Sequence, residues 1–250
     1  LLGGIVASTD AAAVFAVMRN TSLKERPTRI LEGEAASNDP VAILLVIGLI
    51  DWIQQPDYGV ADMALLFVKQ LGIGAVVGVV IGWLGARALQ RLDLPTLGLY
   101  PVGSLAVAAI AFGLPDALGG SGFLGVYIAG LVLGSSIIPA KRTLSAFHVG
   151  LAWLSQLAMF LVLGLLVFPS QLAHYAVQGT LLALVLTFVA RPVSTFLLTA
   201  FSRLTTAERV LIGWAGLRGA VPVVLATFPV IAGIPDSVEY FNIVFFAVVL

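Results

Sequence analysis

The sequence predicts an all-helical protein that crosses a membrane several times. Of the 250 residues, 60% are hydrophobic and 10% are charged, whereas soluble domains have roughly 25% charged residues. Because so few charges cannot cover a water-facing surface of this size, we expect much of the surface to face lipid. The 13 basic and 13 acidic residues cancel, which gives no reason to expect a nucleic-acid partner.

Apolar stretches long enough to form membrane spans, which need about 20 residues each, recur along the chain. We predict nine spans, at 1–18, 29–50, 61–86, 95–114, 119–138, 147–168, 174–200, 208–228 and 239–250. The first span begins at Leu1 and the last ends at Leu250, each within an apolar run. We therefore expect both spans to be truncated. The chain 1–250 is interpreted as one membrane transport domain, a fragment that lacks earlier spans and its C-terminal end.

Positive charge alternates between the predicted loops. Lys or Arg residues lie in the first, third, fifth and seventh loops, and the loops between them have neither. Because cytoplasmic loops carry an excess of Lys and Arg, we place the odd-numbered loops in the cytoplasm. Span 1–18 then runs from outside to inside, and span 208–228 runs the opposite way.

Glycine recurs at every fourth position in two spans, at Gly74, Gly78 and Gly82 and at Gly130 and Gly134. Small residues at this spacing let helix backbones approach closely, so we predict packing faces there. The run Gly120-Ser121-Gly122-Phe123-Leu124-Gly125 also satisfies the dinucleotide pattern GxGxxG. That pattern indicates a nucleotide site only between a strand and a helix. Here it begins an apolar span, so packing is favoured again.

Metal and cofactor chemistry have no support in the sequence. There is no cysteine, and the two histidines are His148 and His174. Disulfides and thiolate metal sites are therefore excluded, and so is a histidine-based zinc site of the HExxH kind. We expect no cofactor and no resident metal ion.

Ionisable residues inside a span are the strongest functional signal, because each costs roughly 2.5–3.5 kcal/mol at mid-bilayer. Asp39 lies about ten residues from Arg29 and about eleven from Ile50. At 1.5 Å per residue this places it roughly 15 Å from either end, at the bilayer midplane. The alternative for Asp39 is a hydrogen-bonded acid that specifies packing.

Two further buried charges lie where the helix is predicted to break. Asp10 ends the run Ser8-Thr9-Asp10, whose side chains compete for backbone hydrogen bonds. Arg218 lies in Gly216-Leu217-Arg218-Gly219-Ala220-Val221-Pro222. Irregular backbone at membrane depth is tolerated where it lines a protein cavity or water. The alternatives are that Asp10 caps a helix near an interface and that Arg218 reaches the inner interface.

Glu34 precedes Asp39 by five residues, so it lies about 140° around the helix and roughly 7.5 Å along it. The two acids cannot serve one coordination point by helix geometry alone. We therefore expect Glu34 to neutralise Arg218 and Asp39 to remain free to titrate. Alternatively, Glu34 is an interfacial acid that answers Arg29.

The interrupted spans 1–18 and 208–228 run in opposite directions. Two discontinuous helices of opposite polarity that meet at mid-depth are typical of inverted-repeat transporters, with the site at the crossing. Half-helix ends expose opposing dipoles there, which Asp10 and Arg218 can neutralise.

Three motifs resemble those of the sodium or potassium:proton antiporters of the NhaP/CvrA type. They are Ser8-Thr9-Asp10, Glu34-Ala35-Ala36-Ser37-Asn38-Asp39-Pro40 and Gly216-Leu217-Arg218-Gly219-Ala220, in the family's order. The resemblance covers essentially the whole chain, as the later nine of the family's thirteen spans. It implies an inverted-repeat antiporter fold with two interrupted crossing helices, and a homodimer with a dimerisation part and a moving core.

The resemblance also implies residue roles. Asp39 binds a cation or a proton, helped by Asn38 and by the backbone of Thr9. Asp10 and Arg218 stabilise the crossing, with Glu34 paired to Arg218. The Asn-Asp pair is associated with electroneutral exchange.

Two positions depart from the family pattern. Ala11 stands where the family often has Pro, and Ala35 stands where many members have Ser. In those members, this Ser lies one turn before the key Asp and can help to bind the ion.

We therefore predict secondary antiport of Na⁺ or K⁺ against H⁺ in a cell membrane, as in a bacterial inner membrane, by competition for Asp39. Two other classes stay open. A cation channel or uniporter needs a continuous polar path, whereas the buried charges cluster on three spans. A membrane-embedded enzyme needs a nucleophile with its base, and neither histidine lies near a suitable partner in sequence.

Overall fold

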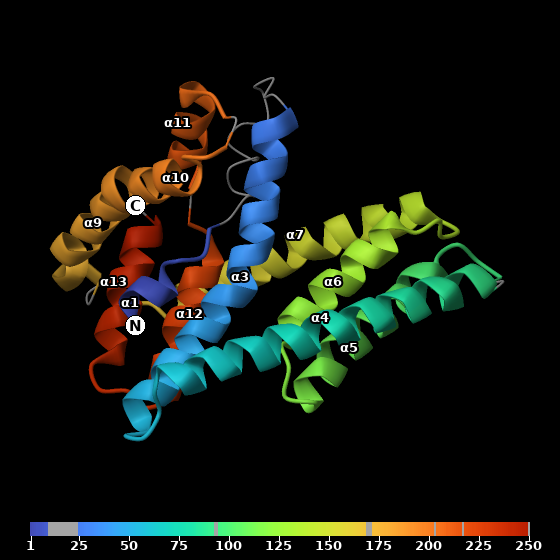
Figure 1. Cartoon of the computed structure of the whole chain (residues 1–250), viewed down its shortest axis with the longest axis horizontal. Helices are drawn as coiled ribbons and strands as arrows, with labels where there is room; N and C mark the ends of the chain where they lie inside the picture. The colour runs from blue at the N-terminus through green and yellow to red at the C-terminus, as the bar shows by residue number, and fades with distance from the viewer. Residues whose placement is uncertain (10–24, 93–94, 169–171, 203, 217, 250) are drawn as a thin grey trace. The chain divides into compact units, whose positions relative to one another are not determined.

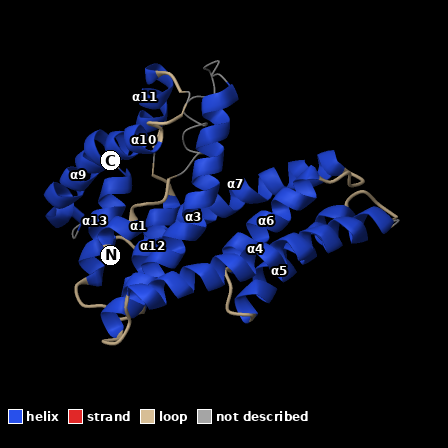
Figure 2. Cartoon of the chain, viewed as in Figure 1, coloured by secondary structure: helices blue, strands red, loops and turns tan. Residues whose placement is uncertain are grey.

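The computed structural model describes residues 1–9, 25–92, 95–168, 172–202, 204–216 and 218–249. All regular secondary structure in these ranges is helical (Figure 2). Five of the described helices are long and apolar enough to cross a membrane, and three shorter apolar helices accompany them. The prediction of an all-helical membrane protein is confirmed on this point.

The chain divides into two compact units, which are described separately. The first unit comprises Leu1–Gln55 and Met159–Leu250, and the second comprises Pro56–Ala158. The second unit contains α4 (Val60–Arg91), α5 (Leu99–Ala117), α6 (Gly122–Ser135) and most of α7 (Lys141–Leu165). The first unit contains α1 (Leu2–Ile5), α3 (Glu25–Gln54), η1 (Ala173–Tyr175), α9 (Ala176–Val185), η2 (Leu186–Ala190), α10 (Arg191–Leu198), α11 (Thr206–Trp214), α12 (Ala220–Ile231) and α13 (Ser237–Val249) (Figure 1).

The helix α6 is shorter than the predicted span 119–138. Gly119 adopts a left-handed backbone conformation, with φ of 75°, which glycine tolerates at no steric cost. Ser121 then caps the helix by accepting a hydrogen bond from the backbone N–H of Leu124, as N-cap serines commonly do. At the other end, Ser136 returns to extended backbone. The turn chemistry at both ends therefore shortens the helix relative to the apolar run.

Close backbone contact between α4 and α6 organises the second unit. A Cβ atom built on Gly78 would lie 2.6 Å from the carbonyl oxygen of Gly125, and one built on Gly82 would lie 2.8 Å from the Cα atom of Ala129. These distances leave room for hydrogen only, so the packing role predicted for the glycines of α4 is confirmed. Gly125 also packs against α5, since a Cβ atom there would lie 2.6 Å from Pro115. This last glycine of the GxGxxG run thus serves packing, as expected.

The second glycine pair behaves differently. A Cβ atom on Gly130 or Gly134 would meet nothing within 4 Å, so the close helix contact predicted for this pair is wrong. Both residues instead line a cavity in the second unit. The four-residue spacing alone does not say whether a neighbour lies on that face of the helix.

The first unit is built around the middle of α3. Ala42 and Val46 of this helix pack with Ile5 of α1, Ala226 of α12 and Val244 of α13 in one buried cluster. α1 contacts both α3 and α12, and α12 lies beside α13 (Figure 1). This packing brings the start of the chain against the region around Arg218.

Both predicted helix interruptions coincide with observed ends of helices. α11 ends at Trp214 and α12 begins at Ala220, so the break predicted at the Gly-Leu-Arg-Gly motif is confirmed. In the first span, α1 ends at Ile5, and Ser8 and Thr9 have no regular structure. The continuation of that span lies outside the described residues. α3, in contrast, continues through Pro40.

The glycine contact between α4 and α6 predicts a matched pair of variants. We expect Gly78→Ala to lower thermal stability in detergent, because its methyl group must displace the backbone of α6, with overpacking costing about 1–3 kcal/mol. Gly130→Ala should leave the melting temperature unchanged or slightly raised, since open space surrounds that position and alanine favours helix. Equal melting temperatures for the two variants would contradict the observed contact.

Candidate functional site

Four polar residues meet where the broken first span passes the middle of α3. Asp39 is the fifteenth of the 30 residues of α3. The hydroxyl of Ser8 donates a hydrogen bond to Oδ1 of Asp39 at 2.5 Å. The side-chain amide of Asn38 donates to the hydroxyl of Thr9, also at 2.5 Å. Asp39 is therefore hydrogen-bonded to the broken span, and its titration between a proton and a cation stays a prediction.

This cluster offers oxygen atoms in a protected place. Ser8 has no exposed surface and Thr9 is 7% exposed. The side-chain oxygen Oδ1 of Asn38 is buried and accepts no hydrogen bond from any described residue. Buried polar atoms almost always have a partner, so this acceptor, on the residue that precedes Asp39 in the chain, indicates a place for a further donor or a cation. We identify Asp39, Asn38, Ser8 and Thr9 as the candidate ion site.

Arg218 connects the two helix breaks. From the break between α11 and α12, its Nη1 donates hydrogen bonds to the carbonyl oxygens of Val6 and of Ser8, the latter at 2.7 Å. These carbonyls lie just beyond the end of α1, where the backbone has left the helix. The predicted role of Arg218 at the crossing thus has a concrete form, namely hydrogen bonding of unwound backbone.

Glu34 pairs with an arginine that the sequence interpretation overlooked. Nη1 of Arg191 contacts Oε1 of Glu34, and Nη2 donates to Oε2 at 2.8 Å. This two-point geometry is the strongest that arginine and a carboxylate form. The Arg191 side chain is 10% exposed and that of Glu34 is 30% exposed. The predicted pairing of Glu34 with Arg218 is therefore corrected, although Arg218 lies within electrostatic range of both residues.

Local backbone features present Arg191 to its partner. It follows the π-helical turn η2 and begins α10, and π turns of this kind often occur at functional sites. A Cβ atom on Gly216 would overlap the Arg191 side chain, so the first glycine of the Gly-Leu-Arg-Gly motif makes room for it. The signal was present in the sequence, since Arg191 is a charge inside the predicted span 174–200.

Asp10, predicted to answer helix ends at the crossing, lies outside the described residues. Among the residues that the structure does describe, no group of three His, Asp or Glu side chains could hold a resident metal ion. Within the described part of the chain, the donor set at Asp39 is instead one carboxylate with neutral amide and hydroxyl oxygens. Such a set suits a weakly held monovalent cation, because its single negative charge is balanced by one positive charge.

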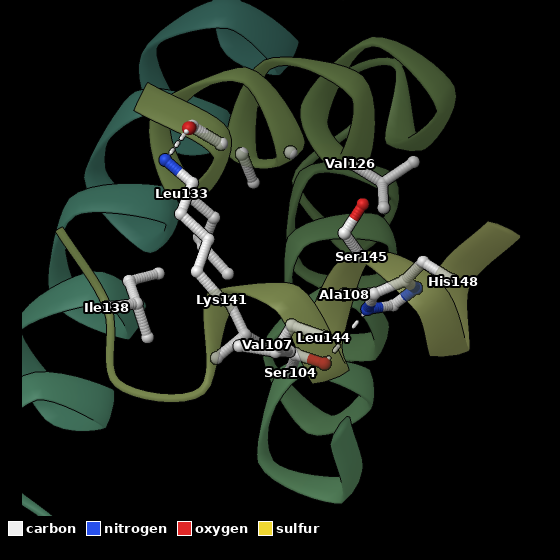
Figure 3. A pocket seen from close by; sticks show the side chains of 13 residues that line it. Ser104, Val107, Ala108, Val126, Leu133, Ile138, Lys141, Leu144, Ser145 and His148 are labelled. Carbon is white, nitrogen blue, oxygen red and sulfur yellow. Dashed lines mark hydrogen bonds between the residues drawn. The ribbon is translucent and has the colours of Figure 1, made fainter. Parts of the chain in front are cut away.

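A separate cavity of about 540 Å³ lies in the second unit and contains none of the predicted ion-binding residues (Figure 3). Lys141 there donates hydrogen bonds to the carbonyl oxygens of Gly134 and Ser136, at 2.6 and 3.2 Å, and so caps the end of α6. Ser104 lies 2.9 Å from Nε2 of His148 (Figure 3). The Ser104 hydroxyl also hydrogen-bonds the carbonyl oxygen of Pro101, at 2.7 Å.

Comparison with known proteins finds likeness along the whole chain. Residues 1–250 match the family model described as "Sodium/hydrogen exchanger, transmembrane". The chain is 41% identical over 253 residues to the K(+)/H(+) antiporter NhaP2 of Shewanella sp. (strain ANA-3). It is 40% identical over 254 residues to the K(+)/H(+) antiporter NhaP of Alkalimonas amylolytica, and 32% identical over 268 residues to the Na(+)/H(+) antiporter ApNhaP of Aphanothece halophytica. These matches cover 100% of this chain and 44%, 44% and 50% of the relatives, so it spans about half their length.

The fold has a solved counterpart. The structure of the sodium proton antiporter MjNhaP1 from Methanocaldococcus jannaschii superimposes with a TM-score of 0.83 at 23% identity. The likeness covers 100% of this chain and 68% of that one. It confirms the predicted all-helical antiporter fold, while the inverted repeat stays a prediction.

The corrected ion pair predicts strong coupling between Glu34 and Arg191. Each single change, Glu34→Ala or Arg191→Ala, should lower the melting temperature because the remaining charge loses its partner in a mostly buried place. The double variant should lose less than the sum, with a coupling of about 1–3 kcal/mol. The same cycle with Glu34 and Arg218 is the control and should show weaker coupling. Stronger coupling with Arg218 would instead support the pairing first expected from the sequence.

Proposed function

We propose, from the premise that this chain belongs to the transmembrane sodium/hydrogen exchanger family, that it exchanges a monovalent cation for a proton. The chain is a multi-pass protein of the cell membrane. The observation that carries the proposal is the polar cluster at Asp39, where Ser8 donates to the carboxylate and the buried Oδ1 of the preceding Asn38 has no donor among the described residues.

Coupling follows from competition at one carboxylate. Asp39 binds a proton on an oxygen or a dehydrated cation beside it, but not both, because either one neutralises the same charge. Asn38 Oδ1 and the region of Thr9 supply further oxygen atoms for the cation. Alternation of the site between the two membrane faces then exchanges one ion for the other. Neither a cofactor nor a covalent intermediate is needed for this cycle.

The relatives support both the exchange and the choice of cation. Two relatives that are 40–41% identical are named K(+)/H(+) antiporters, and one that is 32% identical is named an Na(+)/H(+) antiporter. We therefore propose K⁺ as the preferred cation. We also propose a homodimer in a bacterial inner membrane, with the first unit as the moving core because it contains the ion site, and an inverted repeat that relates the two broken spans.

The alternatives have less support. A channel or uniporter needs a continuous polar path, whereas the polar cluster here is local and is flanked by the apolar packing of α3, α1 and α12. An enzyme needs a nucleophile activated by a base. The serine that contacts His148 also hydrogen-bonds the carbonyl oxygen of Pro101, which competes with the histidine for the single hydroxyl hydrogen. Transport rather than catalysis is the activity that these residues support.

The central role of Asp39 predicts the result of one substitution. In vesicles that contain the full-length protein, Asp39→Asn should abolish the cation-induced change of a pH dye, because an amide cannot exchange a proton for a cation. Asp51→Asn, on the same helix, is the matched control and should keep wild-type flux. Cation-induced proton flux at the wild-type level in Asp39→Asn vesicles would refute the proposal.

One-for-one exchange predicts that the transport rate does not depend on the membrane potential. If a single carboxylate alternates between one proton and one cation, no net charge crosses the membrane in a cycle. We expect the transport rate to stay constant when a membrane potential is imposed with a permeant-anion gradient. A clear change of rate with that potential would indicate a second titrating group in the cycle.

A further inference from the structure

We propose that the hydroxyl of Ser8 is a ligand of the transported cation and sets which cation the site prefers, an inference that rests on the proposed function. Ser8 lies outside the Asn-Asp pair and is held between two elements. Its hydroxyl contacts Asp39 at 2.5 Å, and its carbonyl oxygen accepts a hydrogen bond from Arg218 at 2.7 Å. It has no exposed surface.

Arg218 hydrogen-bonds two backbone oxygen atoms of the broken span and so makes them less available to a cation. Unwound backbone could offer carbonyl oxygens to a cation, as transporters commonly do. Here the carbonyls of Val6 and Ser8 both accept hydrogen bonds from the same guanidinium nitrogen. A cation placed against those oxygens would also lie beside a fixed positive charge. The oxygen that Ser8 can direct toward Asp39 is therefore that of its side chain.

A hydroxyl suits both states of the site. It has one hydrogen to donate and two lone pairs to offer. When the carboxylate is ionised and no cation is bound, the hydroxyl can donate its hydrogen to Asp39, the direction that the 2.5 Å hydrogen bond has. When a cation is bound beside Asp39, a lone pair of the same oxygen can face the cation. Because Arg218 fixes the Ser8 backbone, this oxygen stays at a set distance from Asp39, and such fixed oxygens are one source of cation selectivity.

On α3, neither Ala35 nor Ser37 offers Asp39 a hydroxyl equivalent to that of Ser8. Ala35 lies four residues before Asp39 on α3, so the two side chains share one face of the helix. Its methyl group supplies no oxygen there. Ser37 does not replace it, since that hydroxyl donates to the carbonyl of Gly33 within the same helix. Ser8 thus provides, from the broken span, a hydroxyl that α3 does not provide to Asp39.

The test uses full-length protein in vesicles and in detergent. The vesicle measurement is the concentration of K⁺, Na⁺ or Li⁺ that gives half-maximal proton flux. The detergent measurement is the rise in melting temperature caused by each cation, because a ligand that binds the folded state stabilises it. Ser8→Ala should weaken the apparent affinity about tenfold or more, as expected for losing one bond to a charged group, and should change the ratio between cations.

Three further variants separate binding from folding. Ser8→Cys keeps nearly the same volume and replaces oxygen with sulfur, so it should lose affinity as Ser8→Ala does even if the alanine variant folds poorly. Ala35→Ser, added to either variant, should restore part of the affinity by supplying a hydroxyl on the same side of Asp39. Ser37→Ala is the matched control and should leave the affinity and the cation ratio unchanged.

Two outcomes would overturn the inference and leave the proposed function standing. In the first, Ser8→Ala and Ser8→Cys keep the wild-type affinity and cation ratio, while Asp39→Asn is inactive. In the second, both variants lose flux and thermal stability but keep the full stabilisation by each cation, which would make Ser8 a structural residue only. Active Asp39→Asn vesicles would instead refute the proposed function itself.

Discussion

Satisfying unwound backbone inside a membrane is the constraint on which the rest of the site depends. A carbonyl group without a partner at that depth costs several kcal/mol, because no water can replace the missing donor. Arg218 meets this demand by donating to the carbonyls of Val6 and Ser8. The arginine in turn stands in a break of its own, between α11 and α12. Each interrupted segment therefore stabilises the other, and the helix ends beside Asp39 are held in place without closing into continuous helix.

Arg191 and Arg218 stabilise the region around the two helix breaks through different partners. Arg191 binds Glu34 in a two-point contact. Its side chain also lies against Gly216, the residue that follows the C-cap of α11. Arg218, two residues after Gly216, hydrogen-bonds backbone carbonyls instead of a carboxylate. Had Glu34 paired with Arg218, the carbonyls of the first break would have lost their donor.

Physical reasoning from the sequence located the two helix breaks, because glycines and polar residues within apolar runs indicate them directly, and it placed Asp39 in the middle of a long apolar helix. It failed where geometry across helices decides the outcome. The pairing of Glu34 was predicted from charges already singled out, and Arg191 was overlooked although the same cost argument applied to it. Gly130 and Gly134 repeat the spacing of Gly78 and Gly82, but the spacing cannot tell a face that meets another helix from one that lines a cavity. Whether Oδ1 of Asn38 meets a donor among the described residues depends on the orientation of one amide, which no sequence pattern specifies.

The charge balance of the described cluster explains why exchange at this site need not move net charge. Arg191 and Arg218 contribute two positive charges, and Glu34 and an ionised Asp39 contribute two negative ones. Binding a proton to Asp39 raises the total by one unit, and binding a monovalent cation beside it raises the total by the same unit. Any further charged group adds equally to both loaded states. The loaded forms are thus electrostatically alike, and both differ from the empty form by one unit of charge. Replacing one loaded form by the other therefore moves no net charge across the membrane, as a one-for-one exchange requires.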